Sequence, residues 1–310
     1  MSADDTIHPM PITPEEIDLF WRRTRDELAK QALETTIELA TDNVPFELYH
    51  VAFYSLGGVR VRANLAKPID VGSPKRRYPA IISAPGYSGV AFGEALADCQ
   101  RGYVLLQVYP RMQGASAQFL PRDPVLGTNW LLYGIESPDQ YYYHGAFADL
   151  CRGIDYLLTR DDVDAGRIGA MGSSQGGFLS LGLAAIDNRI KAVAAHVPFL
   201  CDLRHNPCFN PAGGPDTYWG QMPTPDMDQL LSTFDYFDPV NLAPRITMPV
   251  ALSSGGQDEV CPPNTIRAVF DRLPDIRSLT HYPQLSHTPR TDFFAMTWEW
   301  MRTYVKEPDR

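Results

Sequence analysis

The sequence predicts an α/β fold, built on a mostly parallel central sheet with helices on both faces. Strand-like and helix-like segments alternate along the whole 310-residue chain, which is typical of parallel strands joined by crossover helices. The run 103–109 is too continuously apolar for a strand with one face in water, so it belongs inside such a sheet. This length suits one α/β domain, so we expect a single domain over 1–310.

The N-terminal segment predicts a helical arm over 1–45. Its start is marked by Thr13 as N-cap, Pro14 at the first helical position and Glu16 as the partner in a capping box. Large apolar residues then recur at helical spacing, namely Ile17, Phe20, Trp21 and Leu28. We expect this stripe to pack on the main body rather than to bind a ligand.

The next segments alternate between strand and helix patterns. Apolar alternation over 46–68, interrupted by Gly57-Gly58, predicts antiparallel strands. Then follow the apolar strand 78–83, the loop 84–89, a helix over 91–100 and the buried strand 103–109. Pro, Gly and Asn are frequent in 111–140, which predicts an insertion at the sheet edge or over the site.

The second half continues this alternation around a glycine-bounded serine. In order, we expect a helix over 142–159, a polar turn over 161–164, the strand into the serine and the helix after it, a buried strand over 191–197, an irregular cap-like segment over 201–235, a strand over 250–254, a helix over 264–273, a strand over 278–282 and a final helix over 291–305. These strands extend the parallel sheet.

Ser174 lies in Gly172-Ser173-Ser174-Gln175-Gly176, between an apolar strand and a helical pattern. A serine hydroxyl attacks only when it stands clear of the backbone beside a base, and a sharp strand-to-helix turn with small residues two positions away on each side presents it so. The motif alone often occurs by chance. Because the required strand and helix are both present, we interpret it as the nucleophile elbow of an α/β-hydrolase fold.

The base and the acid should follow Ser174, since the chain order in this fold class is serine, acid, histidine. His287 is the best base because it lies in a loop after a predicted strand, at the sheet edge where the elbow opens. His281 is its rival, but it lies inside that strand, where we expect it to be packed. His196 and His205 precede any late acid and break the order.

Asp258 is the best candidate for the acid that orients the histidine and stabilises its charged form. It lies in a loop after a strand, whereas Asp235 and Asp238 precede that strand and suit a turn or the cap. Each such residue alone is more often a solvated surface group. Three of them in the required order, each after a strand, predict a catalytic triad of Ser174, Asp258 and His287.

Backbone amides should hold the oxyanion of an acyl-transfer reaction. The N–H of Gln175, directly after the nucleophile, is one natural donor, and the N–H of Tyr87, in the loop after an early strand, is the other. Because both donors are backbone groups, a side-chain substitution at Tyr87 tests this role poorly.

Aromatic side chains in the insertion and the cap could line an acyl or sugar pocket. They are Trp130, Tyr133, Tyr218 and Trp219. Plain packing of a lid over the core explains them equally well, and both roles stay open.

The charge balance favours a small or neutral partner. With 37 acidic and 27 basic residues and a net charge of -10, the chain lacks the basic surface that binds nucleic acid or an anionic membrane. The acidic first residues are unlike a signal peptide, and no segment approaches the roughly 20 apolar residues of a membrane span. We therefore expect a soluble, cytoplasmic protein.

Neither the cysteines nor the histidines form a metal-binding pattern. The five cysteines are scattered, so we expect free buried thiols at Cys99, Cys151, Cys201, Cys208 and Cys261. The seven histidines show no HExxH or similar cluster. We predict no catalytic metal.

Several longer motifs, spread over about 21–300, occur together in one known family. They are Pro85-Gly86-Tyr87-Ser88-Gly89, Arg111-Met112-Gln113-Gly114, Tyr141-Tyr142-Tyr143 with Phe147 and Asp149, Arg167-Ile168, Gly172-Ser173-Ser174-Gln175-Gly176-Gly177, Val197-Pro198-Phe199-Leu200-Cys201 and Gln257-Asp258-Glu259-Val260-Cys261-Pro262-Pro263. In these motifs the chain resembles the acetylxylan esterase and cephalosporin C deacetylase family, carbohydrate esterase family seven. The last motif is far more specific than the elbow.

The resemblance implies an enzyme that removes acetyl groups from small acetylated sugars, xylo-oligosaccharides or cephalosporin C, through an acetyl-enzyme and without a cofactor. It implies the same triad and the same oxyanion donors. Family members are similar to one another in being cytoplasmic and often hexameric, with the sites facing an internal cavity, so it also implies a homo-oligomer.

Three features depart from the family's pattern. Arg111-Met112-Gln113 stands where the family has Arg-Gly-Gln, Thr288 rather than glutamate follows His287, and 115–136 looks shorter and different in character. The alternatives to an acetylesterase are a hydrolase or acyltransferase for another acyl ester, and a non-catalytic binding module on the same fold. Loss of the serine or the histidine would mark the binding module, and both are present.

Overall fold

The computed structural model describes residues 11–40, 44–69, 76–87, 96–119, 130–206, 226–274, 276–288 and 290–307. The strands of these residues form one sheet. In spatial order they are β1 (Thr36–Leu39), β2 (Glu47–Ser55), β3 (Val59–Lys67), β5 (Val104–Tyr109), β4 (Tyr78–Ser83), β6 (Val163–Ser173), β7 (Ile190–His196), β8 (Val250–Gly255) and β9 (Arg277–Tyr282). Neighbours from β5 to β9 pair in parallel, whereas β1, β2 and β3 form an antiparallel edge that joins β5. The predicted mostly parallel sheet is confirmed.

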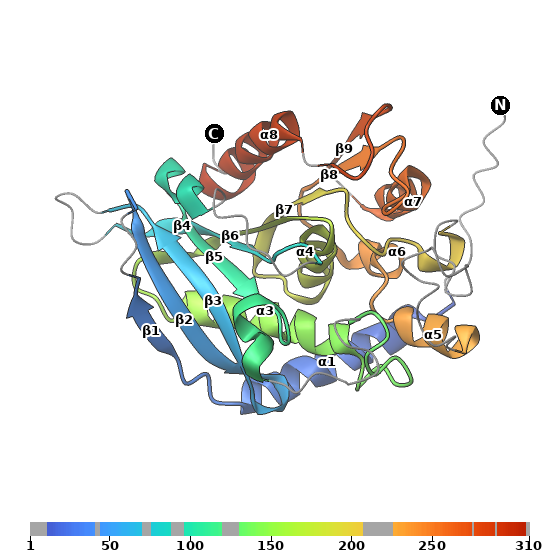
Figure 1. Ribbon diagram of the computed structural model, residues 1–310, viewed down its shortest axis with the longest axis horizontal. Helices are drawn as coiled ribbons and strands as arrows, with labels where there is room; N and C mark the ends of the chain where they lie inside the picture. Colours follow the sequence, from blue (N-terminus) through green and yellow to red (C-terminus); the bar gives the residue numbers. More distant parts are fainter. Residues whose placement is uncertain are drawn as a thin grey trace.

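Helices cover both faces of this sheet, as predicted. They are α1 (Pro14–Lys30), α3 (Tyr142–Leu158), α4 (Gln175–Ile186), α5 (Met227–Phe234), α6 (Pro239–Leu242), α7 (Pro263–Arg272) and α8 (Thr291–Met301). The larger core packs α1, α3 and α4 against one face, and a smaller core around Trp298, Met301 and Val305 packs α8 against the other. In Figure 1, α8 accordingly lies on the opposite side of the sheet from α1 and α3.

The predicted start of α1 is confirmed. The N–H of Glu16 donates to the Thr13 hydroxyl at 3.3 Å, and the Glu16 carboxylate accepts the N–H of Thr13 at 2.9 Å, which closes the capping box. The predicted apolar stripe is buried, and the indole N–H of Trp21 donates to the carbonyl of Tyr236 at 3.1 Å. The helix therefore packs on the main body.

Three elements differ from the sequence prediction. The predicted helical arm over 1–45 contains a strand as well as α1, because β1 pairs antiparallel with β2. The strand into the elbow begins at Val163, inside the predicted polar turn 161–164, because Val163 is buried and pairs with Tyr78 of β4. The segment 201–235, predicted to be irregular, contains α5, whose first N–H groups are capped by the carboxylate of Asp226. Residues 207–225 lie outside the described part of the chain.

Other boundaries shift slightly. Most of the predicted helix 91–100 lies outside the described residues, and its described end forms a 3-10 turn over Asp98–Arg101. The final helix changes at Met301 into a π-helical turn, Arg302–Lys306. Further 3-10 turns are Leu56–Gly58, Gly114–Phe119, Leu203–His205 and Ala243–Arg245.

The cysteine prediction is confirmed wherever the structure describes a cysteine. The thiols of Cys99, Cys151, Cys201 and Cys261 are free and buried. Cys208 lies outside the described residues. In the described segments, no helix has both the length and the apolar character needed to cross a membrane.

Candidate active site

Ser174 lies in a strained turn between β6 and α4. Its φ of 54° and ψ of -119° fall in a region that side-chain-bearing residues rarely adopt, at a cost of about 1–3 kcal/mol. Its N–H donates to the carbonyl of His196 at 2.9 Å, and its carbonyl accepts the N–H groups of Phe178 at 3.0 Å and Phe199 at 3.1 Å. These bonds hold the serine at the N-terminus of α4, in the turn that the elbow motif predicts.

The glycines at 172 and 176 are required because three backbone segments meet at this turn. A Cβ on Gly172 would lie 2.4 Å from the carbonyl carbon of Gly176. A Cβ on Gly176 would lie 2.3 Å from the carbonyl oxygen of Ala84, in the loop after β4. Both obstacles are backbone atoms, which cannot move aside as a flexible side chain can. The two glycines thus let the elbow approach the loop that contains Tyr87.

The three predicted triad residues converge at the carboxyl edge of the parallel strands. Nε2 of His287 lies 3.1 Å from Oγ of Ser174, and Nδ1 of His287 lies 2.8 Å from Oδ2 of Asp258. Oδ1 of Asp258 accepts the N–H groups of Val260 at 2.9 Å and Cys261 at 2.7 Å. The buried carboxylate therefore keeps a proton on Nδ1 and leaves Nε2 to accept one from the serine, as a nucleophile, base and orienting acid require.

The rival residues lie elsewhere. His281 is on β9, as predicted, but its side chain is exposed and Nδ1 lies 2.9 Å from Oγ of Ser254, so the expectation that it is packed is wrong. Asp235 forms an ion pair with Arg204 at 2.6 Å. Asp238 accepts backbone N–H groups from Asp202, Leu203 and Val240. These contacts suit structural roles.

The side chain of Gln175 connects the elbow to the loop after β4. Its Nε2 donates to the carbonyl of Gly86 at 3.3 Å and to Oε1 of Gln113 at 2.8 Å. Nε2 of Gln113 donates back to Oε1 of Gln175 at 2.9 Å. Because a trans peptide is planar, anchoring the carbonyl of Gly86 also fixes the direction of the N–H of Tyr87. The N–H of Gln175 itself is the first of α4 and has no acceptor within that helix.

Sequence reasoning missed the side-chain role of Gln113, since it treated Arg111-Met112-Gln113 only as part of a family motif. The other two residues of this motif, Arg111 and Met112, have structural roles. The guanidinium of Arg111 binds both carboxylate oxygens of Asp149, at 2.7 and 3.0 Å. Met112 is buried with a φ of 64°, the left-handed region that favours glycine. The methionine thus adopts the backbone conformation suited to the family's glycine.

Aromatic rings lie beside the elbow. The ring of Tyr87 packs against Trp130 with centroids 5.0 Å apart and against Phe199 at 5.8 Å. Trp130 is buried and stacks on Tyr142 at 6.0 Å, while Tyr133 is partly buried against the larger core. Tyr218 and Trp219 lie outside the described residues. Trp130 therefore packs in the core and against the ring of Tyr87, and its pocket-lining role stays a prediction.

One group of side chains in the described segments has the spacing of a metal site. Ligand atoms of Asp258, Cys261 and His287 all lie within 4.8 Å of one another. Burial, with a smaller effect of the Asp258 charge, raises the pKa of the Cys261 thiol well above its usual value, so the thiol is protonated at neutral pH. A protonated thiol beside a histidine with both ring nitrogens hydrogen-bonded is a poor metal site.

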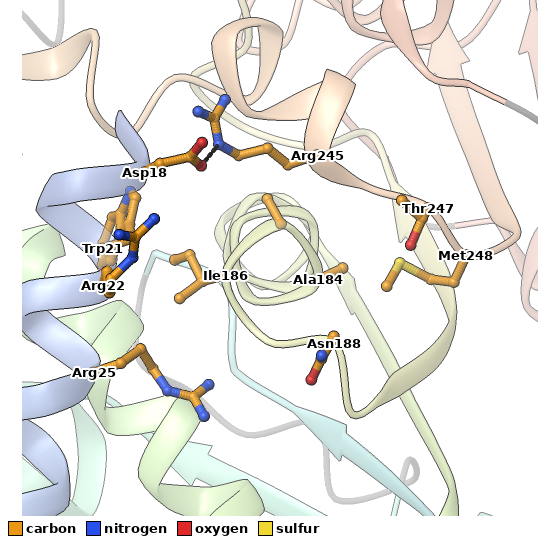
Figure 2. Close-up of a pocket in the computed structure, with 11 residues that line it drawn as sticks. Asp18, Trp21, Arg22, Arg25, Ala184, Ile186, Asn188, Arg245, Thr247 and Met248 are labelled. Carbon is orange, nitrogen blue, oxygen red and sulfur yellow. Dashed lines mark hydrogen bonds and ion pairs between the residues drawn. The ribbon is translucent and has the colours of Figure 1, made fainter. Parts of the chain in front are cut away.

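A surface hollow of about 400 Å³ lies between α1 and the C-terminal end of α4 (Figure 2). Arg22 and Arg25 line it from α1, and Arg245 lines it while paired with Asp18 at 2.9 Å. Ser174 stands at the other end of α4, a helix of 12 residues that spans about 18 Å. The hollow is therefore remote from the triad.

Together, the sheet topology and the serine elbow define an α/β-hydrolase. The family model described as acetyl xylan esterase (AXE1) matches residues 5–303. The chain belongs to this acetyl xylan esterase family, and it is a hydrolase that acts on esters.

Individual relatives agree with this family. The acetyl esterase Axe7A of Xylanibacter ruminicola is 27% identical over an alignment that covers 96% of this chain and 69% of that protein. The solved acetyl xylan esterase from Paenibacillus sp. R4 has a TM-score of 0.84 and 27% identity, covering 96% of this chain and 97% of its own. Acetyl xylan esterase 1 from Thermoanaerobacterium sp. JW/SL YS485 has a TM-score of 0.81 and 25% identity, covering 93% of each chain.

Proposed function

We propose that the protein removes acetyl groups from small acetylated sugars, such as acetylated xylo-oligosaccharides, through an acetyl-enzyme on Ser174. The observation that carries this proposal is the hydrogen-bonded series from Asp258 through His287 to Ser174, with distances of 2.8 and 3.1 Å. Family membership and the names of the relatives support an acetyl ester as the substrate.

In the first half of the reaction, Oγ of Ser174 attacks the carbonyl carbon of the ester while its proton passes to Nε2 of His287. Asp258 stabilises the imidazolium that forms. The N–H groups of Gln175 and Tyr87 stabilise the oxyanion, and each such donor typically contributes about 2.7–4 kcal/mol. His287 then protonates the leaving alcohol, and acetyl-Ser174 remains.

In the second half, His287 removes a proton from water, which attacks the acetyl carbonyl. The second tetrahedral intermediate uses the same oxyanion donors, and its collapse returns the proton to Ser174 and releases acetate. These side chains and backbone amides carry out every step, so the proposal requires no cofactor and no metal.

Aromatic rings favour a short acyl group. Tyr87, Trp130 and Phe199 form a packed set, and the backbone of Phe199 is bonded directly to the carbonyl of Ser174. Because these rings pack tightly on neighbouring elements, we expect them to leave little room for a longer acyl chain. We expect hydrolysis to decrease steeply as the acyl chain lengthens.

The resemblance supports finer proposals. We propose cephalosporin C as an additional substrate, a cytoplasmic location and a homo-oligomer. Light scattering during gel filtration tests the oligomer, and a mass equal to one chain would contradict it.

We also propose that 1–310 form one domain with an arm at 1–45, an insertion at 111–140 and a cap-like segment at 201–235.

A panel of esters tests the function. Acetate release is measured for 4-nitrophenyl acetate, longer 4-nitrophenyl esters, acetylated xylose and cephalosporin C, with the native protein and Ser174→Ala. We expect fast release from acetyl esters and a loss of at least about 1,000-fold in the variant. Ser173→Ala, one residue earlier, is the matched control and should retain activity. Equal rates for Ser174→Ala and the native protein would contradict the proposal.

A further inference from the structure

His196, the last residue of β7, is bonded to both the nucleophile and the loop of the base. Its carbonyl accepts the N–H of Ser174 at 2.9 Å. Its imidazole Nε2 lies 3.3 Å from the carbonyl oxygen of Thr288, the residue directly after His287. His196 is thus hydrogen-bonded both to the backbone of Ser174 and to the backbone of the residue after His287.

The neighbours of His196 determine which ring nitrogen carries the hydrogen. The carbonyl of Thr288 can only accept, so Nε2 is the protonated nitrogen. The N–H of Val197 donates to Oγ of Ser253 at 3.2 Å, which leaves the hydroxyl hydrogen of Ser253 for its short contact with Nδ1 of His196. Burial lowers the pKa of His196 to about 4, so the ring is neutral at neutral pH and has the one hydrogen that this arrangement needs.

Packing leaves the ring of His196 no second orientation. The side chain is fully buried, and it stacks on Phe293 at 4.9 Å and contacts Phe294 at 5.4 Å, both on α8. Turning the ring over by 180° would put the carbon Cε1 in place of Nε2 and the carbon Cδ2 in place of Nδ1, so the bonds to Thr288 and Ser253 would both be lost. The hydrogen bond from the ring to Thr288 is therefore fixed by the position of His196 on β7, by the two phenylalanine rings of α8 and by the hydroxyl of Ser253.

We propose that His196 is a positioning residue, which sets the separation of Ser174 and His287 by hydrogen-bonding to the backbone of Ser174 and to that of Thr288, directly after His287. This inference rests on the proposed function of the triad. It does not make His196 a base or an acid in the reaction, because its ring donates to Thr288 and not to the reacting atoms. Since misplacement of a catalytic group by about 1 Å can cost about 100-fold in rate, loss of this bond should slow the chemical step.

Two substitutions separate the hydrogen bond from simple packing. His196→Leu fills most of the volume but removes the N–H, whereas His196→Gln keeps an N–H at a similar reach. We expect His196→Leu to lower kcat on 4-nitrophenyl acetate by about 10- to 100-fold with KM changed less than about threefold. His196→Gln should recover most of this loss.

A second readout does not depend on the substrate. A sulfonyl fluoride labels an activated serine, with formation of the Oγ–S bond, cleavage of the S–F bond and transfer of the serine proton to the base. The labelling rate of Ser174, followed by intact mass, should fall in parallel with kcat in His196→Leu. If the native protein cleaves no acetyl ester but its labelling depends on His196, the substrate assignment fails and the positioning role is supported.

His281→Leu is the matched control, because His281 likewise contacts a β8 serine, Ser254, at 2.9 Å. It should leave kcat and labelling near native values. Ser253→Ala, which frees Nδ1 of His196 without creating a large cavity, should slow both rates to an intermediate extent and serves if His196→Leu does not fold. Folded His196→Leu with native rates, or equal losses in His196→Leu and His196→Gln, would overturn the proposal.

Discussion

At the scale of single residues, the site depends on polar groups that have few alternative partners. Asp258 is surrounded by two backbone N–H groups and one imidazole, so its carboxylate has no freedom to turn from His287. Gln175 contributes its side chain to the loop after β4 while its backbone N–H is free of the helix. Backbone groups fixed in this way can orient the reacting groups more precisely than mobile side chains alone.

Buried His196 gives a prediction for stability against pH. Its pKa is about 4 in the folded protein and about 6.5 as a free side chain, so between these pH values the unfolded chain binds a proton that the folded chain does not. Its contribution to the free energy of unfolding is therefore complete above about pH 6.5 and lost as the pH falls to about 4.

We test this contribution by urea unfolding of the native protein and His196→Gln between pH 4 and pH 7.5. Because glutamine does not titrate, the difference in free energy of unfolding should shift in favour of the variant by about 3 kcal/mol as the pH falls. Subtracting the free energy of unfolding of one protein from that of the other cancels the contribution of titrating groups that both share. These include Asp238, whose burial raises its pKa to about 7. A difference that is constant with pH would contradict the assignment.

At the scale of elements, the site is a set of loops that follow neighbouring parallel strands. Tyr87 follows β4, Gln113 follows β5, Ser174 follows β6, Asp258 follows β8 and His287 follows β9. Parallel strands place their carboxyl ends at one edge, which is why residues far apart in the chain meet there. The sequence could predict this convergence, since its periodicity shows which loops follow strands along the chain.

A substitution at Met112 tests how the loop after β5 contributes to stability. Its φ of 64° costs about 1–3 kcal/mol, and glycine would relieve this cost, but removal of a buried methionine side chain costs about 2–5 kcal/mol. Because the loss of packing is the larger of the two at mid-range, we expect Met112→Gly to lower the free energy of unfolding, by up to about 4 kcal/mol in urea unfolding. Met112→Leu, which keeps the volume and the backbone cost, is the control and should change it by less than about 1.5 kcal/mol. Increased stability of Met112→Gly would contradict this reasoning.

Contacts between distant segments are what the sequence could not predict. Val163 joins a strand because it pairs with Tyr78, and nothing near it in the chain signals that pairing. Gln113 and Gln175 pair across 62 positions. His196 was set aside because it precedes the acid, a rule that identifies bases but does not show which buried histidine touches the loop of another.

At the scale of the whole molecule, the fold and the family agree on an ester hydrolase. One face of the sheet bears the larger core with α1, α3 and α4, and the other bears α8 (Figure 1). The rings of Phe293 and Phe294 on α8 contact the ring of His196. The net charge of -10 suits a small or neutral substrate better than an anionic polymer. The proposed chemistry thus needs only the elements that the family fold supplies.

The most direct test of the central claim is to find the acetyl group on the enzyme. The native protein is mixed with 4-nitrophenyl acetate, quenched in acid within milliseconds and digested, and the peptides are analysed by mass. We expect the mass of one acetyl group on the peptide that contains Ser174, transient in the native protein and absent from Ser174→Ala. Hydrolysis without that adduct in the native protein, or an adduct on another residue that turns over at the rate of hydrolysis, would contradict a nucleophilic Ser174.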